Sequence, residues 1–281
     1  MSEQASSSVQ TAASPAAETP ANARPRGRGV PKAPWWQTAL FGVVLLVAWQ
    51  LLSGHGLSVV FFSNPGQIAR RFWELASTGG LATTIWVTGK EFLIGYALGV
   101  ACGVALGVLF ALVPRLAGIV QPYLFAFYSV PNIALAPLFV IIFGIGLDSK
   151  VALVTLGAFF FVFLTTYHGV ATIDREFVNV AKTMGASPRL IITDVLVPSA
   201  LPAIFLGMRG AVPHALTGAV VGEFIASSNG LGWMVVNAAN SFDTPGLFVG
   251  VAVLALASLI VTFAIGILER IVLRWTLTQE R

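Results

Sequence analysis

Six long apolar runs, each bounded by charged or turn-forming residues, constrain the fold of this chain more than any other feature. They lie near residues 35–52, 87–112, 119–145, 150–171, 196–224 and 245–273. About 20 apolar residues cross a bilayer as a helix, and a spanning segment must satisfy its backbone hydrogen bonds internally. The runs are too long and continuous for barrel strands. The sequence therefore predicts an all-α, polytopic membrane protein of about six transmembrane helices.

The composition limits the classes of function. Hydrophobic residues make up 56% of the 281 residues and charged residues 10%, which leaves no room for a large soluble catalytic domain. The chain has no G-x-x-x-x-G-K-[ST] phosphate-binding loop, and His55, His168 and His214 are too scattered to predict a metal site. The single cysteine, Cys102, excludes an intrachain disulfide. We expect no enzymatic activity, no cofactor or metal, and no nucleic-acid partner.

The distribution of lysine and arginine predicts the orientation. Residues 1–34 are rich in Ser, Ala, Pro, Glu and Gln and predict a disordered tail, and the run at 35–52 predicts a retained anchor. Cytoplasmic connections carry an excess of basic residues. A cytoplasmic N-terminus leaves only Lys90, Lys150, Arg70 and Arg71 on the outside. We therefore expect a cytoplasmic tail over 1–34, a transmembrane domain over 35–281, and both termini in the cytoplasm.

The first outside connection, about 54–86, has its own helical signal. The sequence SNPG at 63–66 precedes a stretch at 70–73 that mixes arginine with aromatic residues. This pattern predicts a short helix lying at the membrane interface.

Four glycines in the second run recur every four residues and therefore share one helical face. Because they have no side chain, another helix can approach this face closely. The helix-packing glycines are Gly95, Gly99, Gly103 and Gly107.

Prolines and ionisable residues inside the runs mark candidate positions along a translocation pathway. Proline breaks the helical hydrogen-bond pattern, and broken helices at membrane depth often line a pathway; kinking without substrate contact stays open. A carboxylate in a span is costly unless it is paired or hydrated, so Glu91 and Glu223 need a partner, such as Lys90, or water. The pathway or gate candidates are Glu91, Pro131, Asn132, Pro137, Arg209, His214 and Glu223.

The connection between the fourth and fifth runs, residues 174–195, is charged and too polar to span. Asp174 can cap a helix that runs to about Met184, and Gly185 suits its left-handed end. Ser187 and Pro188 can start a second helix as N-cap and first residue. The pattern predicts a compact, two-helix knob on the cytoplasmic face; a connector lying on the lipid surface is the alternative.

The spacing in this connection resembles the EAA loop of ABC importer permeases. A triplet ending in Ala181 is followed by three residues and Gly185, then by nine residues and a segment ending in Pro198. The family's usual glutamate is replaced by Asn179. SVPNIALAPLFVIIFGIGLDSK, GAVVGEFIASSNGLGWMV and LERIVLRW are also similar to segments of the nitrate, sulfonate, taurine and thiamine-precursor permeases.

This resemblance implies the fold of a type I ABC importer permease in the bacterial inner membrane. A separate ATPase subunit would dock on the coupling loop, 174–195, and supply the energy. A periplasmic binding protein would deliver the solute, and a second permease copy would complete the pathway in the lipid bilayer. The residues implied for coupling are Asn179, Ala181, Lys182, Met184, Gly185, Ala186 and Arg189.

The resemblance implies a small solute of the sulfonate, taurine or nitrate type, or a thiamine-precursor pyrimidine or riboflavin. At Glu91 and at the segment Gly222-Glu223-Phe224 the chain resembles the branch that imports pyrimidine-type thiamine precursors or riboflavin more than the sulfonate branch. The alternative from another class is a proton-coupled secondary transporter that uses Glu91 or Glu223.

Overall fold

The computed structural model describes residues 34–53 and 63–274. The disordered tail predicted for 1–34 therefore lies outside the described residues, apart from Pro34. The described part is all-α and has no strand, as predicted. Its helices are α1 (Trp35–Leu52), α3 (Pro65–Ser77), α4 (Gly80–Leu112), α5 (Pro114–Tyr128), α6 (Asn132–Phe143), α7 (Leu147–Ala171), α8 (Arg175–Thr183), α9 (Pro188–Leu190), a π-helical segment (Ile191–Leu196), α10 (Val197–Ala226), α11 (Leu231–Asn240) and α12 (Thr244–Val272).

The chain divides into two compact units within α1. The first unit is Met1–Leu45, of which the described part is the apolar beginning of α1. The second unit is Leu46–Arg281 and contains the remaining described helices.

Four helical segments in the described part are long and apolar enough to cross a membrane. They are α4, α7, the continuous helical run Pro188–Ala226 and α12. The pair α5 and α6 counts as a fifth span only if both helices are taken together, because they meet at a bend of 96°. The helix α1 is a shorter apolar segment.

The third predicted run, 119–145, is broken in the structure, which is one of the two outcomes that its prolines left open. The helix α5 ends at Tyr128, and α6 begins at Asn132 with Pro131 as its N-cap. Proline has no backbone N–H to donate, and the residue before it is disfavoured in the helical conformation. The chain therefore breaks at Pro131, whereas Pro137 lies inside α6.

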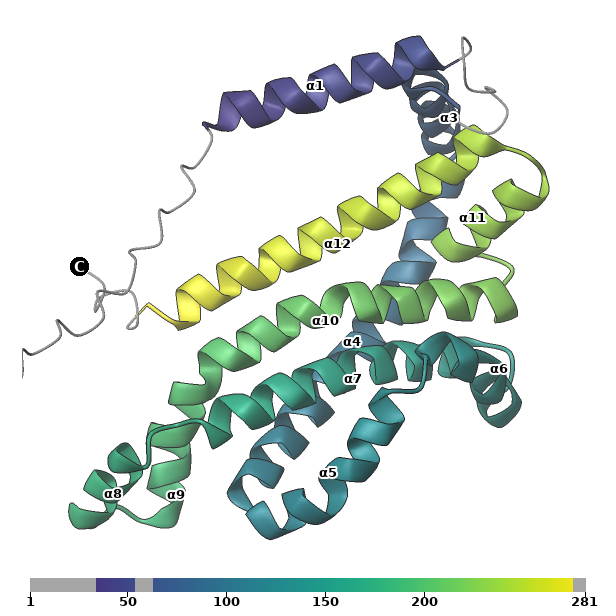
Figure 1. The fold of residues 1–281 in the computed structure, drawn as a ribbon. Helices are drawn as coiled ribbons and strands as arrows, with labels where there is room; N and C mark the ends of the chain where they lie inside the picture. The colour runs from purple at the N-terminus through teal and green to yellow at the C-terminus, as the bar shows by residue number, and fades with distance from the viewer. Residues whose placement is uncertain (1–33, 54–62, 275–281) are drawn as a thin grey trace, which may run out of the picture. The chain divides into compact units, whose positions relative to one another are not determined.

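Helix α7 is the centre of the second unit and packs against both α4 and α10; Figure 1 shows it running alongside α10. Its side chains Val154, Ala158 and Val162 are fully buried. The α4 glycines make this packing close, as predicted for their shared face. A Cβ atom added at Gly99 would lie 2.7 Å from the Cβ of Ala158. The other three glycines of the series meet α7 in the same way: Gly95 at Val154, Gly103 at Val162 and Gly107 at Thr166.

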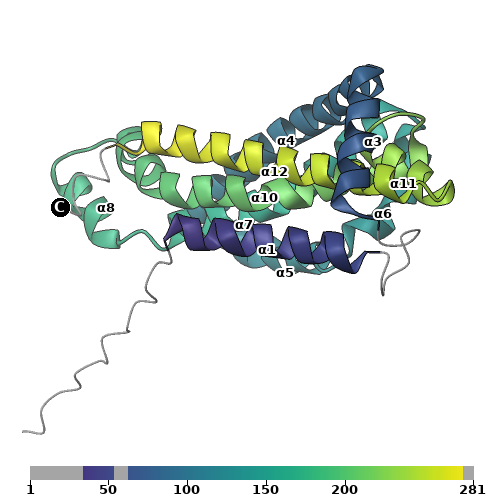
Figure 2. The ribbon, with the colours of Figure 1, turned by 90° about the horizontal axis from the view of Figure 1, so that it is seen from above.

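The two ends of this unit differ in their short helices. The helices α3 and α11 lie at one end, here called the α11 end, and α8 lies at the opposite end, the α8 end (Figure 2). The predicted interfacial helix is α3, with Asn64 as its N-cap and Pro65 at its start. Arg71 of α3 forms an ion pair of 2.7 Å with Asp243, the N-cap of α12. The sequence did not predict α11, which occupies the connection between α10 and α12.

Candidate functional site

A buried ionic cluster at the α11 end contains both intramembrane carboxylates. Glu91 of α4 is 2% exposed and Glu223 of α10 is fully buried. Glu91 forms an ion pair with Lys150 of α7, and Lys150 Nζ also donates a hydrogen bond of 3.2 Å to Ser227 Oγ. This cluster therefore joins three helices through charged side chains that the lipid could not solvate.

The buried partner expected for Glu91 is present, but it is Lys150 and not Lys90, the residue named as an example. Lys90 is exposed, while Lys150 is 6% exposed and forms the ion pair with Glu91. Consecutive residues of a helix point about 100° apart, so Lys90 turns away from the side of α4 that holds Glu91. The sequence placed Lys150 only in an outside connection and missed its role in the cluster.

Glu223 fixes the start of α11. Its carboxylate accepts hydrogen bonds from Thr88 Oγ at 2.6 Å and from the backbone N–H of Gly232 at 2.5 Å. Thr88 Oγ in turn accepts a hydrogen bond of 2.8 Å from the N–H of Leu231. A carboxylate at a helix N-terminus satisfies backbone donors that have no partner within the helix. Both Glu91 and Glu223 therefore have structural partners, which is one of the roles that the sequence left open for them. A cavity of about 540 Å³ also borders Glu91, Lys150 and Ser227.

Three of the predicted pathway residues meet at a second place, the break between α5 and α6. Pro131, Asn132 and His214 line one pocket of about 190 Å³ together with residues of α7. Arg209 lies elsewhere, because it forms an ion pair of 2.9 Å with Glu269 of α12. We call this pocket the ring pocket; its lining residues are Tyr128, Val130, Pro131, Asn132, Gly157, Phe160, Phe161 and His214.

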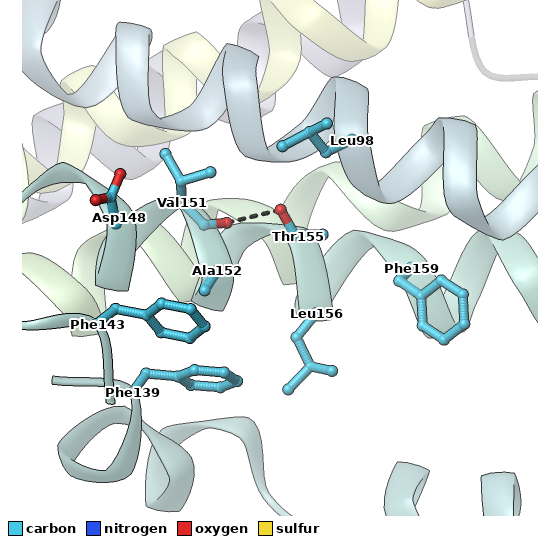
Figure 3. Close-up of a pocket in the computed structure, with 9 residues that line it drawn as sticks. All are labelled: Leu98, Phe139, Phe143, Asp148, Val151, Ala152, Thr155, Leu156 and Phe159. Carbon is cyan, nitrogen blue, oxygen red and sulfur yellow. Dashed lines mark hydrogen bonds between the residues drawn. The ribbon is translucent and has the colours of Figure 1, made fainter. Parts of the chain in front are cut away.

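A larger cavity of about 560 Å³ is bordered by α4, α6 and α7 and is mostly apolar. Figure 3 shows the rings of Phe139 and Phe143 facing the side chains of α7. Asp148 and Thr155 are its polar residues, and Thr155 Oγ donates a hydrogen bond of 2.7 Å to the Val151 carbonyl. None of the predicted pathway residues lines it, so the large cavity offers few groups to recognise a polar solute.

The coupling loop folds as the cap residues predict. Asp174 caps α8 by accepting a hydrogen bond of 2.9 Å from the N–H of Glu176. Gly185 adopts the left-handed conformation with φ +80°. Ser187 Oγ accepts from the N–H of Leu190, and Pro188 begins α9. The π-helical segment that carries this second helix into α10 was not predicted.

The residues assigned to coupling are accessible at the α8 end. Ala181 and Ala186 are half-buried, and the others are exposed: Asn179, Lys182, Met184, Gly185 and Arg189. An apolar stripe runs along α8, with Phe177 65% exposed, Val180 58% and Met184 82%. The loop thus presents apolar side chains that no other described part of the chain covers.

Comparison with known proteins identifies the family. Residues 99–276 match the family described as binding-protein-dependent transport system inner membrane component. The chain belongs to this family. It is 39% identical over 83% of its length to 87% of the riboflavin transport system permease protein RibX of Chloroflexus aurantiacus. It is 35% identical over 86% of its length to 97% of the formylaminopyrimidine transport permease protein ThiX of Halalkalibacterium halodurans.

A solved structure of an ABC transporter has the same fold. The inward-facing MetNI methionine ABC transporter matches with a TM-score of 0.63 and 21% identity, over 70% of this chain and 98% of that chain. The predicted ABC importer permease, its all-α fold and its place as a multi-pass inner-membrane transport subunit are thereby confirmed.

Proposed function

We propose that this permease imports a small solute delivered by a periplasmic binding protein, driven by a separate ATPase that docks on the coupling loop. The observation that carries this proposal is the exposed apolar stripe of Phe177, Val180 and Met184 on a capped, charged helix. An exposed apolar patch on a water-facing segment is typical of a protein interface. Because the stripe can fill an apolar cleft of the partner, docking does not require the family's usual glutamate, which is Asn179 in this chain.

The connectivity supports transmission of motion from the coupling loop to the opposite end. Pro188–Ala226 is one continuous helical run, and the 30 residues of α10 alone extend about 45 Å. This run begins in the coupling loop and ends beside Glu223, which holds the start of α11. A displacement of the loop by the ATPase would therefore reach the ionic cluster through one continuous helical run.

The proposal includes an orientation and an assembly. The α8 end lies in the cytoplasm with both chain termini, and the α11 end faces the periplasm, in agreement with the distribution of basic residues. A second permease copy lies against the exposed face of α10. This face carries Pro202, Leu206, Pro213 and Thr217, which recur with helical spacing and supply a translocation pathway between the copies.

Two glycine-to-arginine substitutions, at positions with nearly the same left-handed backbone conformation, test the docking. Gly185 has φ +80° and Gly79 has φ +73°, and a Cβ atom added at either position meets nothing within 4 Å. Both Gly185→Arg and Gly79→Arg therefore place the same side chain on the same strained backbone, at opposite ends of the unit. We expect the partner ATPase to co-purify with wild type and Gly79→Arg and to be lost with Gly185→Arg. Retention by Gly185→Arg, or equal loss with both variants, would refute docking on the coupling loop.

The proton-coupled alternative has less support. Glu91 is paired with Lys150, and Glu223 is held by Thr88 and Gly232, so both carboxylates already have structural partners. Uptake that persists after ATP depletion while the proton gradient is maintained would favour this alternative over the ATP-driven mechanism.

A further inference from the structure

The ring pocket is built from aromatic side chains of three helices. His214 of α10 stacks against Phe161 of α7, with ring centroids 5.3 Å apart and planes inclined by 29°. The ring of Tyr128 of α5 lies beside that of Phe160 of α7, with the ring centroids 5.8 Å apart. Aromatic faces attract other flat rings in offset or edge-on arrangements. The pocket therefore presents surfaces suited to a planar ring rather than to a flexible chain.

Polar groups accompany these rings at membrane depth. The Asn132 amide and the His214 imidazole both border the pocket, and α6 begins there without a side-chain cap at Pro131. Polar groups inside a membrane are costly unless they meet a partner or line a water-filled cavity. Amide, imidazole and free backbone N–H groups can pair with the ring nitrogens and amino groups of a heterocycle.

The charge of the pocket disfavours an anion. None of its lining residues is lysine or arginine. Arg209, which lies on α10 with His214, is paired with Glu269. The N-terminus of α6 contributes about half an elementary charge, which leaves the full charge of a sulfonate incompletely compensated. Burying such a charge without a paired cation is unfavourable.

The size of the pocket distinguishes one ring from several. Its volume of about 190 Å³ is below the range of about 300–1,000 Å³ that is typical of pockets for drug-sized ligands. We propose that the ring pocket is a transit subsite for an uncharged, single-ring nitrogen heterocycle of the aminopyrimidine type. This inference rests on the proposed import function and assigns a substrate class to its pathway.

Direct binding of a labelled aminopyrimidine to the full chain in lipid nanodiscs tests the assignment. We expect saturable binding to wild type, and about tenfold weaker binding, equal to about 1.4 kcal/mol, to Asn132→Ala and to His214→Ala. His168→Ala is the matched control, because His168 of α7 also contacts an aromatic ring, that of Tyr167 with ring centroids 5.3 Å apart, but does not line the pocket. Excess taurine and excess riboflavin should leave the bound label in place.

Several results would overturn the subsite. They are an absence of saturable binding to wild type, unchanged binding in both pocket variants, equal weakening by His168→Ala, and displacement of the label by taurine or riboflavin. Capture of the partner ATPase by the same wild-type preparation is measured in parallel. A failed binding test with intact ATPase capture refutes the subsite alone, whereas failed capture refutes the proposed function.

Discussion

The contact between α4 and α7 allows a quantitative test within a single helix. The glycines Gly89 and Gly99 both lie in α4. A Cβ atom added at Gly99 would lie 2.7 Å from the Cβ of Ala158 and 2.7 Å from the carbonyl oxygen of Thr155, whereas one added at Gly89 meets nothing within 4 Å. Gly99→Ala and Gly89→Ala are therefore identical substitutions that differ only in the space around them.

The expected effects have opposite signs. Overpacking of a close contact costs about 1–3 kcal/mol, since α4 and α7 must separate to restore an ordinary carbon–carbon distance. In contrast, an alanine in an open helical position is favoured over glycine by up to about 1 kcal/mol. Each kcal/mol changes the melting temperature by about 2–4 °C in a protein of 150–250 residues. Gly99→Ala should therefore melt several degrees below Gly89→Ala.

Thermal unfolding of the purified chain in one detergent measures this difference. The intrinsic helix propensity is common to both variants and cancels in the comparison. A melting temperature of Gly99→Ala equal to or above that of Gly89→Ala would show that α4 and α7 are not in close contact at this position, and the packing described for the glycine face would be wrong.

Three further outcomes are expected. Lys150→Met should lower the free energy of unfolding by about 3–5 kcal/mol, because it leaves the buried Glu91 carboxylate unpaired. The double variant with Glu91→Gln should recover part of this loss. A Lys150→Met variant as stable as wild type would exclude the ion pair. In a cysteine-free variant, an impermeant maleimide should label Ser77→Cys in intact spheroplasts and Thr183→Cys only after lysis, because these exposed residues end α3 and α8, which lie at opposite ends (Figure 2); the reverse pattern would invert the orientation. Ser187→Ala removes the cap of α9, so a cost of about 1 kcal/mol should weaken ATPase affinity about fivefold, and unchanged affinity would show that this cap does not order the docking surface.

Features that depend on neighbouring residues along the chain could be predicted from the sequence. Apolar length indicated the membrane-spanning helices, and the cap residues Asp174, Gly185 and Ser187 indicated both short helices of the coupling loop. The spacing of that loop, together with the similar segments around it, also indicated the family. These signals are local, because caps and helix periodicity involve residues only a few positions apart.

Features that depend on how helices are rotated and offset against one another required the tertiary structure. The sequence did not show that Lys150, rather than Lys90, pairs with Glu91. Nor did it show that Pro131 turns the chain by 96° instead of kinking one span, or that Asn132 and His214 share a pocket. Hydrophobic spans carry little register information of their own, because lipid solvates every apolar face equally well. The close glycine contacts and the buried ion pair select one arrangement, and both exist only after the helices have packed.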